Sequence, residues 1–186
     1  MSKKEIRTHF LEKRKAIPQG THKMWSQRIA DSVQEGLSSD HKWIHIFLPI
    51  ASKAEVATHE LIKILWASGK KVVVPKIQPK GQLSHHLWMP ATPKLVNQWG
   101  ITEPIDDNSI EAQQLDVVIV PLLAIDQNGQ RVGYGKGFYD RFLANCRSDV
   151  IRIGIGFFPP IAPIADIEST DIPLDSYITQ EKTYLF

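Results

Sequence analysis

The sequence predicts an α/β protein with a mainly parallel central sheet and flanking helices. The order strand, helix, strand over 43–75 is that of one βαβ unit, whose two strands are expected to run parallel. The segment 116–121 is apolar throughout, as a central parallel strand buried on both faces must be. A chain of 186 residues suits one well-cored domain, and no repeat or low-complexity run divides it, so residues 1–186 are expected to form a single domain.

Composition and charge argue against several classes of protein. Hydrophobic residues make up 42% and charged residues 23% of the chain, as in a globular protein. The formal net charge of +2 gives no reason to expect a nucleic-acid or membrane partner. The single cysteine, Cys146, has no partner for an internal disulfide and is expected to pack in a helix. No apolar run reaches membrane-spanning length and the N-terminus is polar, so we expect a cytoplasmic protein.

Two amphipathic helices are predicted at the start of the chain. The first covers 3–17 and is ended by Pro18, and the second covers 21–37. Their apolar residues recur near helical spacing: Ile6, Phe10, Leu11 and Ile17 in the first, and Trp25, Ile29, Val33 and Leu37 in the second.

Three basic residues lie along the first predicted helix. Lys3 and Arg7 are four positions apart and share a face, and Arg14 lies two turns further along. Taken alone, this pattern favours a solvated basic face over a binding site.

Three strands are predicted next. The first is 43–48, and the loop 49–58 leads from it into a helix that Gly69 ends. The second strand is 70–75 and the third is 81–88. The loop 49–58 therefore lies at the carboxyl end of a strand, which is the usual ligand side of an open α/β sheet.

His85 and His86 are adjacent on the third strand, so their side chains are expected on opposite faces. We interpret both as surface or pocket-rim residues rather than zinc ligands, because no cysteine or further histidine is suitably spaced. Residues 89–115 are loop-rich, and Trp99 within them is expected either to stack on a ligand or to anchor the loop.

The strand 116–121 leads to a stretch with the composition of a phosphate-binding loop. In 131–140 the glycines Gly133, Gly135 and Gly137 alternate, and Lys136 lies between the last two. Glycines allow backbone N–H groups to converge on an anion and allow a ligand to approach the main chain closely. The spacing is neither that of the P-loop nor that of the dinucleotide motif.

A helix over 137–146 and a buried strand over 151–156 are predicted after the glycines. Asp140 falls in the first turn of that helix, where a carboxylate is stabilised by the helix dipole or can bind a magnesium ion held by phosphates. A structural alternative stays open, because Asn128-Gly129 between two apolar runs is a good hairpin turn.

The run Pro-Leu-Leu-Ala-Ile-Asp over 121–126, followed by Asn128-Gly129 and then Arg-Val-Gly-Tyr-Gly-Lys-Gly-Phe-Tyr-Asp over 131–140, closely resembles the signature of the 5-formyltetrahydrofolate cyclo-ligases, also called methenyltetrahydrofolate synthetases. The resemblance implies a three-layer fold of the NagB/RpiA/CoA-transferase-like class. It also implies ATP- and Mg²⁺-dependent closure of 5-formyltetrahydrofolate to 5,10-methenyltetrahydrofolate with release of ADP and phosphate.

The same resemblance assigns roles to individual residues. It implies catalytic roles for Arg131, Lys136 and Tyr139. Nucleotide contacts are implied for the basic residues of the first helix and for the glycine segment, namely Lys3, Lys4, Arg7, Arg131, Gly133, Tyr134, Gly135, Lys136, Gly137, Phe138 and Tyr139. Folate contacts are implied for Leu48, Glu55, Tyr134, Gly135, Lys136, Gly137 and Phe138. Asp140 and Asp171 correspond to the magnesium positions.

The chain departs from the family pattern at three places. Ala57 stands where an acidic or polar residue is usual, Tyr134 where some members carry arginine, and Thr170 where histidine is common. Asp175, near the end of the chain, is expected to be structural, and Leu48 fits an ordinary core position equally well.

Two other functions remain compatible with the residues. One is a protein that binds reduced folate without turning it over, and the other is a sugar-phosphate isomerase that needs no nucleotide. For the cyclo-ligase interpretation the partners are small molecules, reduced folate and ATP, and a monomer is expected.

Overall fold

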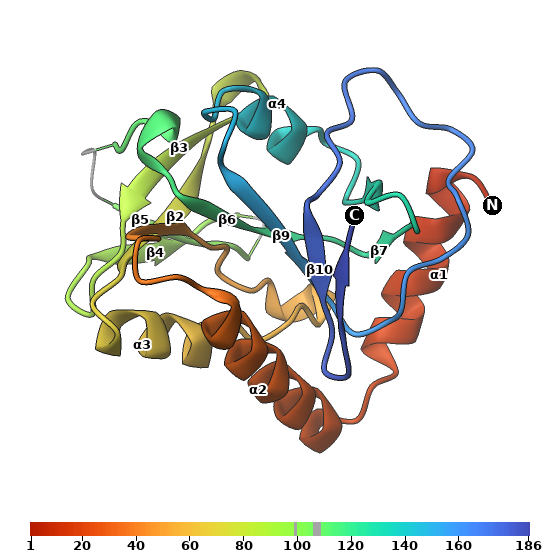
Figure 1. The fold of residues 1–186 in the computed structure, drawn as a ribbon, viewed down its shortest axis with the longest axis horizontal. Coiled ribbons are helices and arrows are strands. Elements are labelled where there is room, and N and C mark those ends of the chain that lie inside the picture. Colours follow the sequence, from red (N-terminus) through yellow and green to blue (C-terminus); the bar gives the residue numbers. More distant parts are fainter. Residues whose placement is uncertain (99, 106–108) are drawn as a thin grey trace.

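The computed structural model describes residues 1–98, 100–105 and 109–186, so the alternatives for Trp99 lie outside the described residues. The central strands are β1 (Trp43–His45), β2 (Lys71–Gln78), β3 (Gln82–Leu87), β6 (Val117–Pro121), β9 (Ile151–Ile155), β10 (Ser176–Ile178) and β11 (Thr183–Leu185). They form a seven-stranded sheet in the order β11-β10-β9-β6-β1-β2-β3 (Figure 1).

Most pairs in this sheet are parallel. Strand β1 pairs in parallel with β2 and β6, and β9 pairs in parallel with β6 and β10. Antiparallel pairing occurs at the two edges, where β3 pairs with β2 and β11 with β10. The prediction of an α/β fold with a mainly parallel sheet is confirmed.

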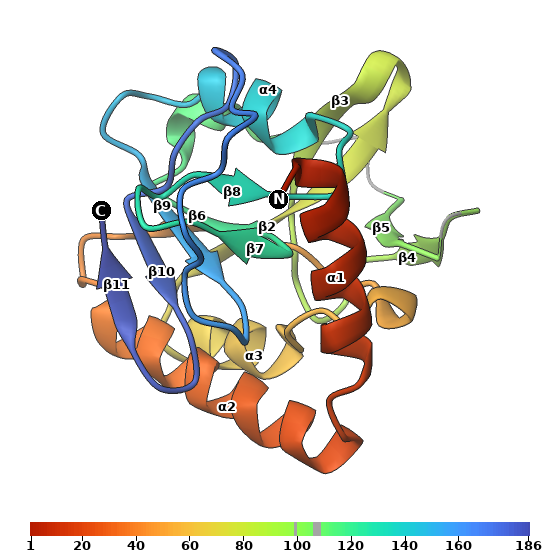
Figure 2. The same cartoon turned by 90° about the vertical axis from the view of Figure 1, so that its right-hand side faces the viewer.

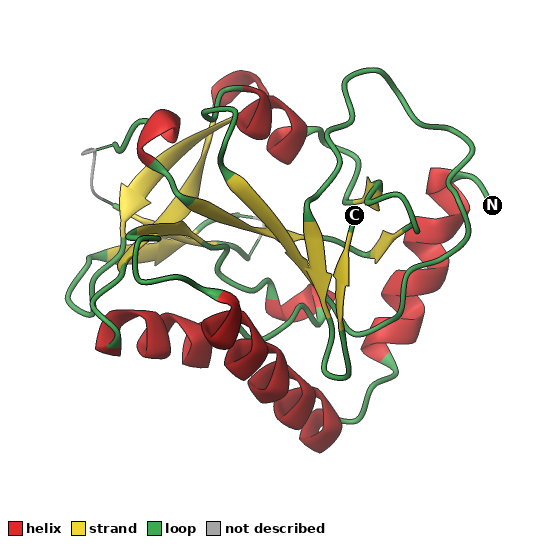
Figure 3. Ribbon diagram, viewed as in Figure 1, coloured by secondary structure: helices red, strands yellow, loops and turns green. Residues whose placement is uncertain are grey.

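Helices cover both faces of the sheet (Figure 3). On one face lie α2 (Gln19–Gly36) and α3 (His59–Ala67), whose Ile29, Val33, Leu61 and Leu65 pack on sheet residues such as Ile44, Val72 and Val117. On the other face lies α4 (Phe138–Ala144), whose Phe142 and Leu143 pack on Val73, Val118 and Val120. The sheet residues that contact one layer of helices alternate along each strand with those that contact the other layer, because successive side chains point to opposite faces.

Helix α1 (Lys3–Lys15) lies at the carboxyl end of the central strands, beside a small ribbon of β7 (Ala124–Ile125) and β8 (Arg131–Val132) (Figures 1 and 2). Ile6 and Phe10 of α1 pack there with apolar residues of the ribbon and its surroundings, namely Leu123, Ala124, Val132 and Ile164. Ser2 caps the helix, and Glu5 completes a capping box with it. A second ribbon, β4 (Lys94–Val96) with β5 (Thr102–Pro104), lies within the stretch predicted as loop-rich.

The structure corrects two predictions about polar residues. His85 and His86 point to opposite faces, as predicted, but both are buried and neither is a surface or rim residue. The solvated basic face predicted for α1 is also wrong, because Lys3 and Arg14 are buried. None of the described helices is both long and apolar enough to cross a membrane.

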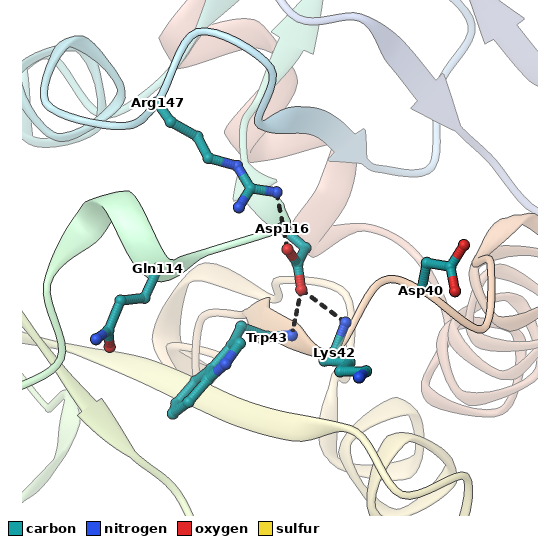
Figure 4. Close-up of a pocket in the computed structure, with 6 residues that line it drawn as sticks. All are labelled: Asp40, Lys42, Trp43, Gln114, Asp116 and Arg147. Carbon is teal, nitrogen blue, oxygen red and sulfur yellow. Dashed lines mark hydrogen bonds and ion pairs between the residues drawn. The ribbon is translucent and has the colours of Figure 1, made fainter.

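A half-buried carboxylate joins the amino ends of two central strands (Figure 4). Asp116, just before β6, accepts hydrogen bonds from the N–H groups of Lys42 and Trp43 at 2.7 and 2.8 Å, and from Nη2 of Arg147 at 2.8 Å. Partial burial acts to raise the pKa of Asp116, but these hydrogen bonds outweigh it and hold the pKa below its ordinary value. Asp116 lines a shallow pocket with Asp40 and Gln114, on the edge opposite the glycines.

Replacing Asp116 by alanine is expected to lower the free energy of unfolding by about 1–3 kcal/mol at pH 7, because three donors lose their acceptor. Since folding depresses the pKa of Asp116, its contribution is present above the unfolded-state pKa of about 3.9 and is lost as pH falls through the folded-state pKa. Urea denaturation from pH 7 to 3 checks both expectations. Asp149→Ala, which removes an exposed partner of the same arginine, is the control; an equal loss in both variants contradicts the role given to Asp116.

Candidate active site

The hairpin that precedes the glycine segment is organised by one buried carboxylate. Oδ1 of Asp126 accepts hydrogen bonds from the N–H groups of Asn128 and Gln130, both at 2.9 Å, and Oδ2 accepts one from Ile164 at 3.0 Å. Gly129 has a φ of +78°, and a Cβ there would lie 2.7 Å from the carbonyl oxygen of Leu174. The hairpin proposed for Asn128-Gly129 is therefore confirmed.

The glycine loop, which we define as residues 133–137, extends beyond this hairpin and leads into α4. Within the described part of the chain, its backbone N–H groups donate no hydrogen bond to other backbone groups. The side chain of Lys136 is exposed, and no ion pair joins its ammonium group to a described carboxylate. The loop thus presents free donors and a positive charge, and the structural hairpin and a phosphate-binding loop are compatible with each other.

Helix α1 lies directly against the glycine loop. Nε of Arg7 donates a hydrogen bond to the carbonyl oxygen of Gly133 at 3.0 Å. A Cβ at Gly135 would lie 3.1 Å from Cζ of Arg7, and the φ of Gly135 is +83°. The positive φ favours glycine at position 135, and any larger residue would also have to displace the Arg7 guanidinium slightly.

Arg141 of α4 is a loop-positioning residue that the sequence did not indicate. Its guanidinium donates to the carbonyl oxygen of Gly81 at 2.6 Å and to that of Lys136 at 2.7 Å. Arg141 thereby joins the glycine loop to the turn between β2 and β3. The available signal was its place one turn after the loop, on the side of α4 opposite its apolar face.

Two residues predicted to act on phosphate and metal pair with each other. Nη2 of Arg131 lies 2.8 Å from Oδ1 of Asp140, and Nη1 donates to the carbonyl oxygen of Ile172 at 2.7 Å. The N–H of Ile172 in turn donates to Oδ1 of Asp140 at 3.2 Å. Because Ile172 follows Asp171, these contacts bring the two predicted magnesium ligands to the same side of the glycine loop.

A second cation and carboxylate pair in the same way. The ammonium group of Lys3 forms an ion pair with Oδ2 of Asp171, which also accepts a hydrogen bond from the N–H of Glu168 at 2.7 Å. Partial burial acts to raise the pKa of Asp171, but Lys3 and Glu168 outweigh it and the pKa lies below its ordinary value. Lys4, in contrast, is exposed and lines a shallow surface hollow with Thr8 and Glu12.

Among the described residues, no group of three or more histidine, cysteine or acidic side chains could hold a metal ion by itself. Asp140 and Asp171 nevertheless fit Mg²⁺, which is usually held by one or two carboxylates together with water and substrate phosphates. The two carboxylates would hold the ion, and phosphate oxygens would complete its coordination.

The predicted folate residues lie at the loop 49–58 and at the glycine loop. Glu55 is buried, and its Oε2 accepts a hydrogen bond from the N–H of Ile50 at 2.7 Å. Its Oε1 accepts one from the hydroxyl of Tyr134 at 2.6 Å, so the two predicted folate-binding segments are in contact. Leu48 is part of the main hydrophobic core, as the structural alternative for it requires.

A buried aromatic cluster lies beneath α4, next to the glycine loop. The rings of His45 and His85 are 5.1 Å apart, His45 is 4.6 Å from Phe142, and Tyr139 is 5.9 Å from Phe142. Among the described residues, neither ring nitrogen of His45 has a hydrogen-bond partner, and the hydroxyl of Tyr139 has none either. Burial, and then repulsion from His85, holds the pKa of His45 well below its ordinary value; burial lowers the pKa of His85 to about 4.

His45→Leu is expected to raise the free energy of unfolding at pH 7 by about 1 kcal/mol, because it removes two buried polar atoms without partners. Since folding lowers the pKa of His45, the unfolded chain takes up the proton first, and stability is lost as pH falls below about 6.5. The Leu variant should lose less over pH 7 to 5 in denaturation experiments. His45→Gln is the control: it should also flatten the pH dependence but bring no gain at pH 7. A steeper pH dependence in either variant contradicts this account.

The chain is similar to a known protein family and to several of its members. The model of the 5-formyltetrahydrofolate cyclo-ligase family matches residues 1–180. The 5-formyltetrahydrofolate cyclo-ligase of Haemophilus influenzae is 35% identical over 135 residues, which cover 70% of this chain and 72% of the relative. The enzyme of the same name from Escherichia coli K12 is also 35% identical, over 70% of this chain and 74% of its own.

Two solved structures agree with the fold over nearly the whole chain. The 5,10-methenyltetrahydrofolate synthetase of Aquifex aeolicus superposes with a TM-score of 0.84 at 26% identity, covering 100% of this chain and 93% of that one. The synthetase of Mycoplasma pneumoniae gives a TM-score of 0.77 at 26% identity, covering 97% and 99%. With the family model spanning all but the last few residues, the chain belongs to the 5-formyltetrahydrofolate cyclo-ligase family.

Proposed function

We propose that this protein uses ATP and Mg²⁺ to close 5-formyltetrahydrofolate to 5,10-methenyltetrahydrofolate, with release of ADP and phosphate. The observation that carries the proposal is the meeting of three features at one edge of the sheet. These are the unpaired donors of the glycine loop, the cations of α1 and the carboxylates Asp140 and Asp171. An edge with convergent donors and charges of both signs suits a nucleotide with its metal.

The chemical problem is that a formamide is a poor electrophile. Transfer of the γ-phosphoryl group of ATP to the formyl oxygen breaks the bond to ADP and forms an iminium phosphate. The N10 amine of the same folate then attacks the activated carbon, the C–O bond breaks, and phosphate leaves as N10 gives up its proton. Binding both ends of the folate in one conformation holds N10 near that carbon, and such proximity is worth several kcal/mol.

Phosphoryl transfer requires neutralisation of charge and alignment more than covalent help from the protein. The ammonium group of Lys136, which is exposed, and the loop N–H groups would stabilise the transferred group. Lys3 and Arg7 lie along α1 beside the loop and would contact the nucleotide phosphates. When bound, Mg²⁺ neutralises phosphate charge.

Phosphate binding requires two ion pairs to exchange partners. Lys3 pairs with Asp171, and Arg131 pairs with Asp140. With a nucleotide and Mg²⁺ bound, Lys3 and Arg131 would contact phosphate and Asp140 and Asp171 would hold the metal, so each of these four charges would regain a partner. Arg131 is anchored by the carbonyl of Ile172 as well, so it would turn only one of its two terminal nitrogens toward phosphate.

Purified protein mixed with 5-formyltetrahydrofolate, Mg²⁺ and ATP is expected to form the methenyl product, followed by its near-ultraviolet absorbance. Lys136→Ala should lower kcat by about a hundredfold or more while folate affinity changes little, because Lys136 acts on charge that develops in phosphoryl transfer. Lys63→Ala, an exposed lysine of α3, is the matched control. Unchanged turnover of the Lys136 variant would remove this residue from the mechanism.

The double variant Lys3→Ala/Arg7→Ala is expected to raise the KM for ATP at least tenfold, because two charge-assisted contacts to phosphate are lost. Direct titration with 5-formyltetrahydrofolate should show nearly unchanged binding of folate alone. A double variant of the exposed lysines Lys15 and Lys23 controls for net charge. Full activity of the Lys3/Arg7 variant without added nucleotide would favour an isomerase-type reaction, and folate binding without turnover in the unchanged protein would favour a sequestering protein.

A further inference from the structure

Arg14 is a buried cation that the proposed reaction does not use. It lies in the last turn of α1 and is 5% exposed. Its guanidinium donates three hydrogen bonds: Nε to the carbonyl of Lys53 at 2.8 Å, Nη1 to that of Leu122 at 3.0 Å, and Nη2 to the hydroxyl of Tyr134 at 2.5 Å. Arg14 therefore contacts three segments that are far apart in the sequence.

The hydroxyl of Tyr134 links Arg14 to Glu55 through two hydrogen bonds. It accepts from Arg14 and donates to Oε1 of Glu55 at 2.6 Å. The direction of the chain is fixed by chemistry, because a guanidinium has no acceptor and an ionised carboxylate has no donor. Both oxygens of Glu55 accept hydrogen bonds, one from Tyr134 and one from the N–H of Ile50, so Arg14 and Tyr134 favour the carboxylate form.

Glu55 depends on such partners because it is 4% exposed. Burial raises its pKa, and the hydrogen bonds from Ile50 and Tyr134 and the charges of Arg14 and Lys53 oppose the rise without cancelling it. Other elements also meet this loop: Nε2 of His22, from α2, lies 2.9 Å from the backbone carbonyl of Glu55.

We propose that Arg14 and Tyr134 are positioning residues of the cyclo-ligase reaction, which hold the Glu55 carboxylate in place for folate and couple folate binding to nucleotide binding. The coupling arises because Tyr134 belongs to the glycine loop, while Glu55 belongs to the loop 49–58. A nucleotide that restrains the glycine loop would also restrain the Tyr134 hydroxyl, and it would thereby strengthen the hold on Glu55 before folate arrives. The inference rests on the proposed function.

The first test is Tyr134→Phe, which removes one hydroxyl and leaves the ring in place. Binding of 5-formyltetrahydrofolate is measured by titration, with and without Mg²⁺ and the β,γ-methylene analogue of ATP, which cannot transfer its γ-phosphoryl group. The variant should bind folate about tenfold more weakly, as expected for loss of a hydrogen bond to a charged group. In the unchanged protein the analogue should strengthen folate binding, and in the variant this gain should be lost.

The pH profile separates positioning from a merely structural role. Without the Tyr134 hydroxyl the carboxylate form of Glu55 is less favoured, so folate binding by the variant should fall off at a higher pH than in the unchanged protein. Tyr177→Phe is the matched control, because the buried Tyr177 hydroxyl donates one hydrogen bond, at 2.8 Å, to the carbonyl of Phe158 away from Glu55. It should lower thermal stability and leave folate binding, the effect of the analogue and the pH profile unchanged.

Arg14→Lys supplies a second, independent variant. It keeps the charge but not the geometry of three donors, so it too should weaken folate binding. If both residues act through Glu55, the loss in the double variant is smaller than the product of the two separate losses. This inference would be overturned, and the proposed function left intact, if Tyr134→Phe showed the folate affinity, the effect of the nucleotide analogue and the pH profile of the unchanged protein. Absence of folate binding by the unchanged protein would overturn the proposed function and this inference with it.

Discussion

The candidate site depends on the packing of one helix face against one hairpin. Ile6 and Phe10 of α1 are buried against the β7–β8 ribbon. Full burial of two such side chains is worth about 1.5–3 kcal/mol each. This packing fixes the rotation of α1, and the rotation in turn directs Lys3, Arg7 and Arg14 toward the glycine loop and its neighbours.

The charges gathered by that packing are balanced before any ligand binds. Lys3 is paired with Asp171 and Arg131 with Asp140, and each cation is largely removed from water. Unpaired charges at that depth would be costly, so the pairing allows the site to form without a nucleotide. The same pairing resists a ligand of a single sign. Phosphate alone would free two carboxylates, and a divalent cation alone would free two ammonium or guanidinium groups, whereas the two together satisfy all four side chains.

Sequence patterns predicted the parts of the fold that depend on local chemistry. The helices, the apolar central strand and the Asn128-Gly129 hairpin follow from periodicity and turn residues, and the structure contains them. Sequence patterns failed where contacts with distant parts of the chain decide the burial or the partners of a residue. The sequence predicts His85 and His86 as surface or pocket-rim residues, but both are buried, and His85 stacks on Phe142. Arg141 was missed because its acceptors are backbone carbonyls, one of them sixty residues away.

The prediction of a solvated basic face on α1 is wrong, and the spacing of the basic and apolar residues explains why these cations are buried. Lys3, Ile6, Arg7, Phe10 and Arg14 recur at intervals of three and four residues, so they form one stripe. A solvated basic face lies opposite the apolar stripe of a helix, since the apolar residues need to be covered. Here the cations alternate with the apolar residues on the same stripe, so burying Ile6 and Phe10 necessarily carries the cations into the protein. Such a stripe requires acceptors or anions on the surface it meets. The carbonyl oxygens, the Tyr134 hydroxyl and the Asp171 carboxylate supply them in this protein, and on the proposed function phosphate replaces part of this set.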